Sequence, residues 1–302
     1  MALAVGPRVA IFKRRFHAWW DGYEYIEAAA GEASDAASPP ESGQPNADRW
    51  TAQRIRIAEL IWGDGFNFPG GAEAALDLVK PFDLNKDKVL LDLGCGLGGG
   101  ARAIAKTLGA SVEGLEPSAT LAAQAAAAAE KAGLGKKVSV KAFDPATGKL
   151  PDKRYDAIFA RQVVGLVKDK SPVLTALGNC LKPGAHIMIV EVALATADAD
   201  GPELQEWRAV EDSAPAPPTI ELIADALKRE KLDIQVAEDI APAFKRQVLA
   251  GWARLADEIQ GKDVSPEEKL LLARELDLWA KRLAAFESGG LKLARIHGIK
   301  KS

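Results

Sequence analysis

A glycine-rich turn at residues 92–100 is the segment of this chain best suited to chemistry. It follows an apolar run and reads D-L-G-C-G-L-G-G-G from Asp92 onward. Glycine lets the backbone turn tightly and approach a ligand where other side chains would collide. A strand, a glycine turn and a helix, predicted here over 98–108, are typical of a nucleotide-type cofactor site. We therefore expect Gly94, Gly96 and Gly98 to contact such a cofactor.

Two acidic residues, each followed by proline, stand at the ends of the next two predicted strands. Glu116 precedes Pro117, and Asp144 precedes Pro145. A carboxylate at the second strand end can accept hydrogen bonds from both hydroxyls of a ribose. Each acid alone fits an ordinary solvated loop residue. Acids at successive strand ends after a glycine turn favour a shared site, because ligands of open α/β sheets bind at strand ends.

Strands and helices alternate from residue 88 onward. The predicted strands lie at 89–93, 111–115, 138–143, 155–160, 186–192, 233–237 and 291–299, with helices that include 219–230 and an amphipathic block at 242–287. Such alternation predicts an α/β fold with a doubly wound, mainly parallel sheet of seven strands. We interpret Lys182, Pro183 and Gly184 as the helix stop before the fifth strand.

The bulk composition excludes several classes of function. The chain has 302 residues, 48% of them hydrophobic, a formal net charge of -3 and two cysteines. This charge gives no global basic field for nucleic acid, and two cysteines make no disulfide framework. No apolar run approaches the roughly 20 residues of a membrane span. We expect a cytoplasmic protein that binds no metal and acts on a small-molecule partner.

The first 48 residues differ in composition from the rest. Residues 1–27 are predicted as a basic and aromatic helical segment, and residues 28–48 as a flexible linker. Basic residues beside tryptophans, as in 8–27, favour peripheral contact with an anionic membrane surface. The alternative is packing on the domain or on a second subunit of a homodimer. Both interpretations stay open.

The motif D-x-G-x-G directly after a strand resembles the start of the class I S-adenosylmethionine-dependent methyltransferases. The resemblance implies a Rossmann-like seven-stranded fold, S-adenosyl-L-methionine as cofactor and methyl transfer as the reaction. It implies that Asp92 organises the turn and the amino-acid end of the cofactor. It also implies that Glu116 binds the ribose and that Asp144 lies beside the adenine amino group.

From about residue 49 to its end, the chain is similar to the phosphoethanolamine N-methyltransferase-type subfamily. The similarity implies a helical lid at 49–87 and a methyltransferase domain at 88–302, with the block 242–287 inside it. Trp50 takes the position of a lid tyrosine, and Arg161 falls on a cofactor-side position. The segments that carry the similarity are IWGDGFNFPGG at 61–71, VLLDLGCGLGGG at 89–100, YDAIFAR at 155–161 and LKPGAHIMIVE at 181–191.

The acceptor side departs from that subfamily. Leu166 stands where its members carry a histidine that assists deprotonation of the amine, and Phe66 where a tyrosine is usual. Val192 replaces a tyrosine that touches the substrate phosphate, and the segment APAPP at 214–218 lacks an arginine for the same phosphate. Because these groups are missing, we expect an acceptor other than phosphoethanolamine, with an amine or hydroxyl on a lipophilic or aromatic compound.

No catalytic residue is assigned, and the candidates are Trp50, Phe66 and Glu191. Glu191 ends the predicted fifth strand, where it faces the acceptor or caps a loop. Trp50, Phe66, Trp62 and Phe68 predict an aromatic pocket for a cation or a flat apolar group. The alternative is packing between helices, which we favour for Trp62.

The leading functional hypothesis is N- or O-methylation of a small molecule. A catalytically impaired protein that binds S-adenosylmethionine as a partner or regulator is the alternative, motivated by the missing histidine. An NAD-dependent oxidoreductase is a third, because Gly94, Gly96 and Gly99 also match the G-x-G-x-x-G spacing of dinucleotide-binding folds.

Overall fold

The computed structural model describes residues 48–146, 150, 154–211, 217–260 and 264–302. The chain divides into two units, residues 1–49 and 50–302, and the second carries everything described below. The predicted segment 1–27, with its stretch 8–27, and the linker 28–48 apart from Asp48 lie outside the described residues. The membrane contact and the homodimer inferred from them therefore remain predictions.

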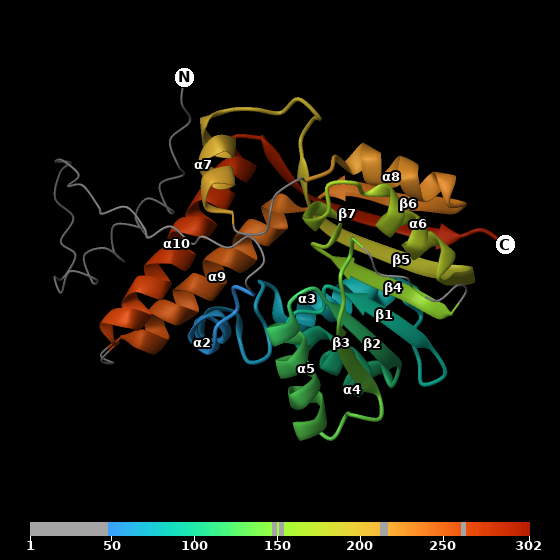
Figure 1. Cartoon of the computed structure of the whole chain (residues 1–302), viewed down its shortest axis with the longest axis horizontal. Coiled ribbons are helices and arrows are strands. Elements are labelled where there is room, and N and C mark those ends of the chain that lie inside the picture. Colours follow the sequence, from blue (N-terminus) through green and yellow to red (C-terminus); the bar gives the residue numbers. More distant parts are fainter. Residues whose placement is uncertain (1–47, 147–149, 151–153, 212–216, 261–263) are drawn as a thin grey trace. The chain divides into compact units, whose positions relative to one another are not determined.

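In the part of the chain that the structure describes, seven strands form one sheet (Figure 1). Their order is β3-β2-β1-β4-β5-β7-β6, and only β7 runs antiparallel to its neighbours. The predicted doubly wound, mainly parallel sheet is therefore confirmed. The strands are β1 Val89–Leu93, β2 Ser111–Glu116, β3 Val138–Ala142, β4 Tyr155–Arg161, β5 Leu181–Leu194, β6 Leu232–Asp239 and β7 Leu291–Lys300.

Helices pack along both halves of this sheet. Helices α4 (Gly99–Leu108) and α5 (Ala119–Lys131) contact β2 and β3. Helix α8 (Ile220–Arg229) contacts β6 and β7 and is itself contacted by α6 (Ser171–Asn179). From β1 the chain continues toward β2 and β3 on one side, and from β4 it continues toward β5 on the other side. The carboxyl ends of β1, β2 and β4 therefore lie at the switch point, where such sheets bind ligands.

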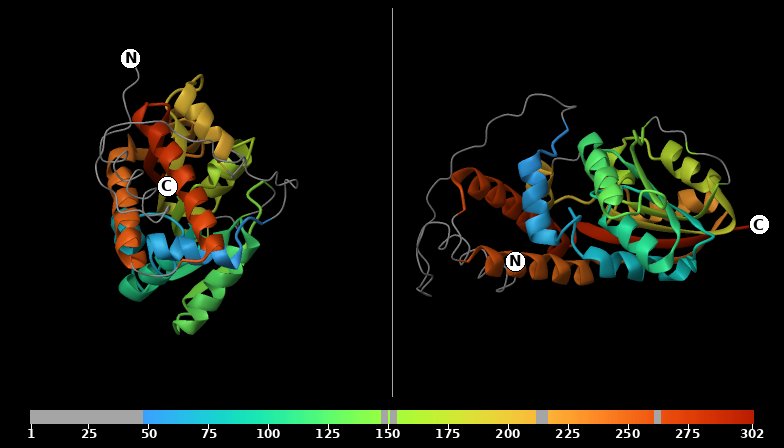
Figure 2. Two further views of the ribbon diagram at one scale, coloured as in Figure 1. Left: turned by 90° about the vertical axis from the view of Figure 1, so that its left-hand side faces the viewer. Right: turned by 90° about the horizontal axis from the view of Figure 1, so that it is seen from below.

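The remaining helices form a cap at one end of the sheet (Figures 1 and 2). Helix α10 is the centre of the cap and contacts α2, α7 and α9. Helix α3 instead packs on α4 and so links the cap to the sheet. The bounds are α2 Ala52–Trp62, α3 Gly71–Val79, α7 Pro202–Val210, α9 Ala241–Ile259 and α10 Pro266–Glu287, with short 3-10 turns η1 Lys80–Phe82 and η2 Val164–Leu166.

Local sequence explains these boundaries. Ser118 accepts a hydrogen bond from the Leu121 N–H at the start of α5, and Ser265 forms a capping box with Glu268 at the start of α10. The central strand β1 is apolar except for Asp92, because neighbouring strands and helices cover both of its faces. Asp92 is 0% exposed, so its charge needs a partner in the fold.

Two details differ from the sequence predictions. The helix stop assigned to Lys182, Pro183 and Gly184 is wrong, because α6 ends at Asn179, and the Cys180 carbonyl already accepts the Tyr155 N–H of β4. Lys182 instead binds both oxygens of Asp156 at 3.0 Å. Helix α7 had no sequence prediction. Within the described residues, no helix has the length and apolar character needed to cross a membrane.

Candidate cofactor and acceptor site

The glycine turn after β1 depends on conformations that favour glycine. Gly94, Gly96 and Gly98 have φ values of +74°, +57° and +73°. A Cβ on Gly94 would lie 2.2 Å from the Arg161 carbonyl oxygen, and one on Gly96 would lie 2.1 Å from Asn67 Oδ1. The turn therefore requires glycine because the end of β4 and the segment before α3 press against it.

Asp92 and Arg161 meet across the ends of β1 and β4. Nη2 of Arg161 lies 2.7 Å from Oδ1 and 2.8 Å from Oδ2 of Asp92. Burial raises the pKa of Asp92, and the nearby guanidinium opposes that rise. The guanidinium also lies over the Phe159 ring, 4.6 Å from its centroid, and the Arg161 side chain keeps 19% of its surface exposed. The two predicted cofactor residues thus form one charge-paired unit beside the glycine turn.

Glu116 at the end of β2 is bound to the same turn. One carboxylate oxygen accepts the Gly96 N–H at 2.7 Å and the other accepts the Ser118 N–H at 3.0 Å. Burial raises the pKa of Glu116, and these two backbone hydrogen bonds oppose the rise. Because each oxygen of an ionised carboxylate can accept more than one hydrogen bond, Glu116 keeps capacity for two ligand hydroxyls. The half-buried Pro117 follows it.

Asp144 lies one strand further along the same edge. It is exposed after β3 and accepts the Ala146 N–H at 2.9 Å, across the half-buried Pro145. The Phe143 N–H donates to the Glu116 carbonyl at 3.0 Å, which keeps this segment beside the end of β2. The predicted acids at 92, 116 and 144 therefore stand at the carboxyl ends of three adjacent strands.

The segment between α2 and α3 closes on the glycine turn. The Gly99 N–H donates to the Gly65 carbonyl at 2.9 Å, and the Leu97 N–H donates to Asn67 Oδ1 at 3.3 Å. Phe66 packs directly on Gly99, where a Cβ would lie 2.7 Å from the phenyl ring. Trp50 is half-buried against a cluster of Ile55, Leu97 and Leu121. Trp50 and Phe66 thus both lie near the turn, as the lid prediction requires.

The predicted pocket of four aromatic residues does not form. Trp62 is buried and packs edge-on against Trp252 and Trp279, with ring centroids 6.3 and 4.9 Å apart. Phe68 stacks on Phe244 at 4.9 Å. These rings hold the cap helices together, because the apolar faces of α2, α9 and α10 meet there. The favoured packing interpretation of Trp62 is therefore confirmed.

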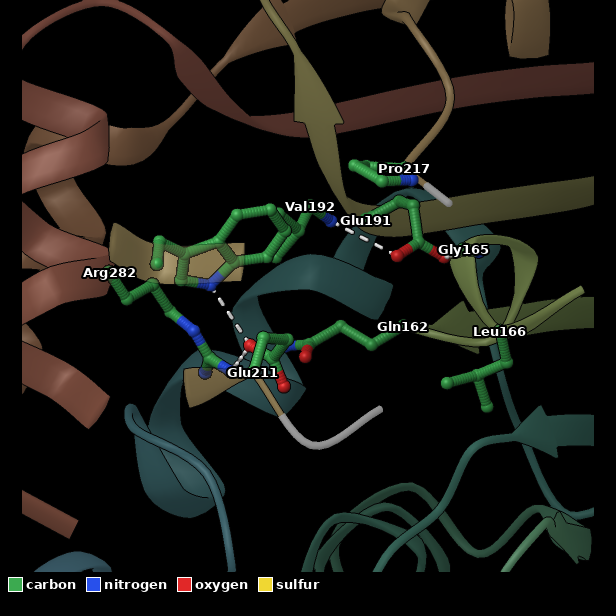
Figure 3. A pocket seen from close by; sticks show the side chains of 9 residues that line it. Gln162, Gly165, Leu166, Glu191, Val192, Glu211, Pro217 and Arg282 are labelled. Atoms are coloured by element: carbon green, nitrogen blue, oxygen red, sulfur yellow. Dashed lines mark hydrogen bonds and ion pairs between the residues drawn. The ribbon is translucent and has the colours of Figure 1, made fainter. Parts of the chain in front are cut away.

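A pocket opens on the acceptor side, beyond the ends of β4 and β5 (Figure 3). Its cavity volume is about 50 Å³, and it is open to solvent on one side. The segment after β4 supplies one wall, the end of β5 another, and α7 and α10 the far side. The lining residues are Gln162, Gly165, Leu166, Glu191, Val192, Trp207, Glu211, Pro217 and Arg282.

Glu191 is the buried carboxylate of this pocket. One oxygen accepts the N–H groups of Val164 at 2.8 Å and Gly165 at 3.3 Å, and the other accepts the Val192 N–H at 3.1 Å. Burial raises the pKa of Glu191 to about 7, although the backbone hydrogen bonds oppose the rise. Glu191 therefore caps the loop after β4 and also lines this pocket, and its role toward an acceptor stays a prediction.

Opposite Glu191, the pocket holds an ion pair that the sequence reasoning missed. Arg282 of α10 binds Glu211 after α7, and the Trp207 indole N–H donates to the same carboxylate at 3.0 Å. Arg282 also lies over the Trp279 ring at 4.5 Å. The pocket therefore contains a cation, which comes from α10 and not from the segment 214–218, and Glu211 neutralises it. Because Arg282 and Glu211 are 71 residues apart, no local sequence pattern predicts their pairing.

The other reactive side chains lie away from this site or are inert. His186 and His297 hydrogen-bond each other at 3.0 Å, His186 near the start of β5, and burial lowers both pKa values. Cys95 is 3% exposed with a pKa raised by burial, as expected for a structural thiol. The described residues contain no cluster suited to a metal ion.

Known proteins resemble this chain in sequence and in fold. A family model described as a methyltransferase domain matches residues 70–230, more than half of the chain. Phosphoethanolamine N-methyltransferase 1 of Zea mays is 31% identical over 47% of this chain and 28% of that protein, so the chain spans less than a third of this relative. Sterol 24-C-methyltransferase of Aspergillus fumigatus is 36% identical over 50% of this chain and 43% of that protein.

A solved structure extends the likeness beyond the matched domain. Phosphoethanolamine N-methyltransferase 2 of Haemonchus contortus, in complex with phosphomonomethylethanolamine and S-adenosylhomocysteine, superposes with a TM-score of 0.71 at 23% identity. The superposition covers 82% of this chain and 57% of that one. The strand order, the glycine turn and the family match all indicate the same methyltransferase fold. The chain belongs to the methyltransferase domain family and has the fold of the class I S-adenosylmethionine-dependent methyltransferases.

Proposed function

We propose that this chain transfers a methyl group from S-adenosylmethionine to a small molecule. The observation that carries the proposal is the turn between Asp92 and Gly98, which Arg161 and Glu116 hold from the two neighbouring strands. In a member of the methyltransferase domain family, this is the edge where a nucleoside cofactor is expected.

The residues at this edge fit the parts of S-adenosylmethionine. Glu116 retains acceptor capacity for the two ribose hydroxyls, and Asp144 is an exposed acceptor one strand away, suited to an adenine amino group. The partly exposed guanidinium of Arg161 suits the carboxylate of the amino-acid end. When bound, this cofactor supplies a methyl group already activated on a sulfonium. The protein then has to orient the acceptor and exclude water.

We propose further that the acceptor carries a neutral or cationic group, methylated on nitrogen or oxygen. Arg282 is the cation lining the pocket, and Glu211 neutralises it. Glu191 adds a second carboxyl group, and among the described residues no other cation lines the pocket, so a phosphate dianion is poorly matched. Relatives named for phosphoethanolamine and for a sterol differ in acceptor, which gives no reason to transfer either one to this chain.

The test is product formation from a defined panel. The whole chain is incubated with S-adenosylmethionine bearing a deuterated methyl group and, separately, ethanolamine, tyramine, catechol and phosphoethanolamine. Mass spectrometry follows S-adenosylhomocysteine and the labelled product. We expect turnover with an uncharged or cationic acceptor and little with phosphoethanolamine.

Two results would contradict the proposal. Efficient turnover of phosphoethanolamine contradicts the acceptor class. Tight binding of S-adenosylmethionine with no product from any panel member, nor from a metabolite extract, contradicts the enzymatic function. That second result favours the alternative of a binding protein without catalysis.

A further inference from the structure

We infer that Glu191 is the catalytic residue that accepts the proton lost by the acceptor during methylation. The inference deepens the proposed function and rests on it. Three observations carry it: the position of the carboxylate in the pocket wall, the glycine that leaves it open, and the charges around it.

The first observation is that the Glu191 side chain is fixed and yet lines the pocket (Figure 3). Val164 and Gly165 hold one carboxylate oxygen by their N–H groups, and the Val192 N–H donates to the other at 3.1 Å. An ionised carboxylate oxygen has room for a further donor. A base held in one orientation by backbone groups is pre-organised to receive a proton from a bound acceptor.

The second observation concerns Gly165 in the pocket wall. A Cβ at this position would lie 3.2 Å from Oε1 of Glu191 and 3.9 Å from Cα of Pro217. The distance of 3.2 Å to Oε1 is shorter than an ordinary van der Waals contact, so a side chain at residue 165 would crowd the carboxylate. The glycine therefore leaves the space beside Oε1 without a side chain, which a loop cap alone does not need.

The third observation is the set of charges around Glu191. The lining contributes Glu211 and Arg282, which neutralise each other, and Lys170 is a charged group that interacts with Glu191 electrostatically. The Lys170 ammonium donates to the carbonyls of Val167 and Lys168 rather than to Glu191. Burial without a direct ion pair raises the pKa of Glu191 to about 7, which suits proton transfer near neutral pH.

The step balances with the methyl donor already proposed. The acceptor heteroatom uses its lone pair to form the new bond to the methyl carbon, and the carbon–sulfur bond breaks with its electron pair remaining on sulfur. The proton of the heteroatom passes to Oε1 of Glu191. It then leaves to solvent at the open side of the pocket, and the carboxylate is restored.

The decisive variants are Glu191→Gln and, as a matched control, Asp156→Asn. Gln is isosteric, and its amide oxygen can still accept the Val164 and Gly165 N–H groups, so this part of the loop cap is retained while the base and the acceptor of the Val192 N–H are lost. Asp156 is a half-buried carboxylate at the opposite end of the sheet, bound to Lys182 and to the Val89 N–H. The readouts are the rate against pH with the best panel acceptor, the affinity for S-adenosylhomocysteine, and the infrared carboxyl band.

We expect Glu191→Gln to lower kcat at least about a hundredfold and to abolish the rise in rate through about pH 7. Its affinity for S-adenosylhomocysteine should stay within about threefold of the unsubstituted chain, since a lost general base does not touch the cofactor. A protonated-carboxyl infrared band that titrates near pH 7 should disappear in this variant and persist in Asp156→Asn.

Three outcomes overturn the assignment. Glu191→Gln with an unchanged rate and pH profile makes Glu191 a loop cap only. A loss of rate matched by an equal loss of S-adenosylhomocysteine affinity makes its role structural. The absence of a titrating carboxyl band removes the base itself. An unsubstituted chain that forms no product contradicts the proposed function instead, and so is distinguished from all three.

Discussion

Arg161 at the end of β4 binds Asp92 at the end of β1 through two hydrogen bonds. Nη2 of Arg161 donates both, at 2.7 Å to Oδ1 and 2.8 Å to Oδ2. The pair joins β1 and β4, the two strands between which the strand order reverses, and Asp92 lies just before the glycine turn in the sequence. Asp92 is fully buried, so Arg161 is what makes its charge tolerable there. The shape of the turn therefore depends on an interaction between residues 69 positions apart.

Removing the Arg161 guanidinium alone should lower the free energy of unfolding more than removing the charges of both Arg161 and Asp92. Arg161→Met leaves Asp92 buried and unpaired, and we expect a loss of about 3–5 kcal/mol in the free energy of unfolding. The double variant Asp92→Asn with Arg161→Met should recover part of that loss. Urea denaturation of both variants and of Asp92→Asn alone measures this. A double variant less stable than Arg161→Met would contradict the pairing.

A side chain at residue 96 should disturb the contact between the turn and the lid. Gly96→Ala adds a Cβ 2.1 Å from Asn67 Oδ1 at a φ of +57°. Because Asn67 must move and the left-handed backbone is strained, we expect a loss of about 2 kcal/mol in stability and weaker binding of S-adenosylhomocysteine.

Asn67→Ala in the same chain is the control for that clash. The double variant should regain the part of the affinity lost to the collision, while the backbone strain persists. If Asn67→Ala changes nothing in the Gly96→Ala background, Asn67 does not press on the turn.

The sequence predicted the positions of the glycine turn and of the acids at the strand ends well, because these features are local. The turn at 92–98, Glu116 and Asp144 each lie within a few residues of a strand end, and the strands show as apolar runs. The acceptor pocket was predicted poorly, since its walls come from distant segments. Nothing near Arg282 or Glu211 in the sequence indicates that the two meet, and the pocket of four aromatic residues does not form because α9 and α10 cover Trp62.

Neutralising Glu211 should change which acceptor charge the pocket tolerates. In Glu211→Gln, Arg282 keeps its charge without its carboxylate partner, so an anionic ligand should gain a cation to bind. We expect phosphoethanolamine to bind at least about tenfold more tightly, an increase of about 1.4 kcal/mol. Calorimetry in the presence of S-adenosylhomocysteine measures this.

Adding Arg282→Met to Glu211→Gln tests whether the charge of Arg282, and not the space made by the Glu211 substitution, raises the affinity for phosphoethanolamine. The double variant should lose the gain in phosphoethanolamine affinity if the guanidinium is responsible. Equal affinity of both variants for phosphoethanolamine would show that Arg282 does not reach the ligand.

The stability of the chain should carry a pH signature of Glu191. Its pKa is about 7 in the folded chain against an ordinary value of 4.5, so the folded state binds the proton more tightly than the unfolded state. Unfolding free energy should therefore fall as pH rises from about 4.5 to about 7, by up to about 3 kcal/mol relative to Glu191→Gln. Parallel urea titrations across that range measure the difference. A difference independent of pH, or an unfolding free energy of the unsubstituted chain that rises with pH relative to that of Glu191→Gln, contradicts the raised pKa.

The most direct test of the account is a calorimetric titration of the whole chain with S-adenosylhomocysteine and, separately, with NADH. The two ligands distinguish a methyl donor site from the dinucleotide site that the G-x-G-x-x-G spacing also permits. We predict saturable binding of S-adenosylhomocysteine that weakens at least about tenfold in Glu116→Gln, and no binding of NADH. Binding of NADH without binding of S-adenosylhomocysteine would contradict the account.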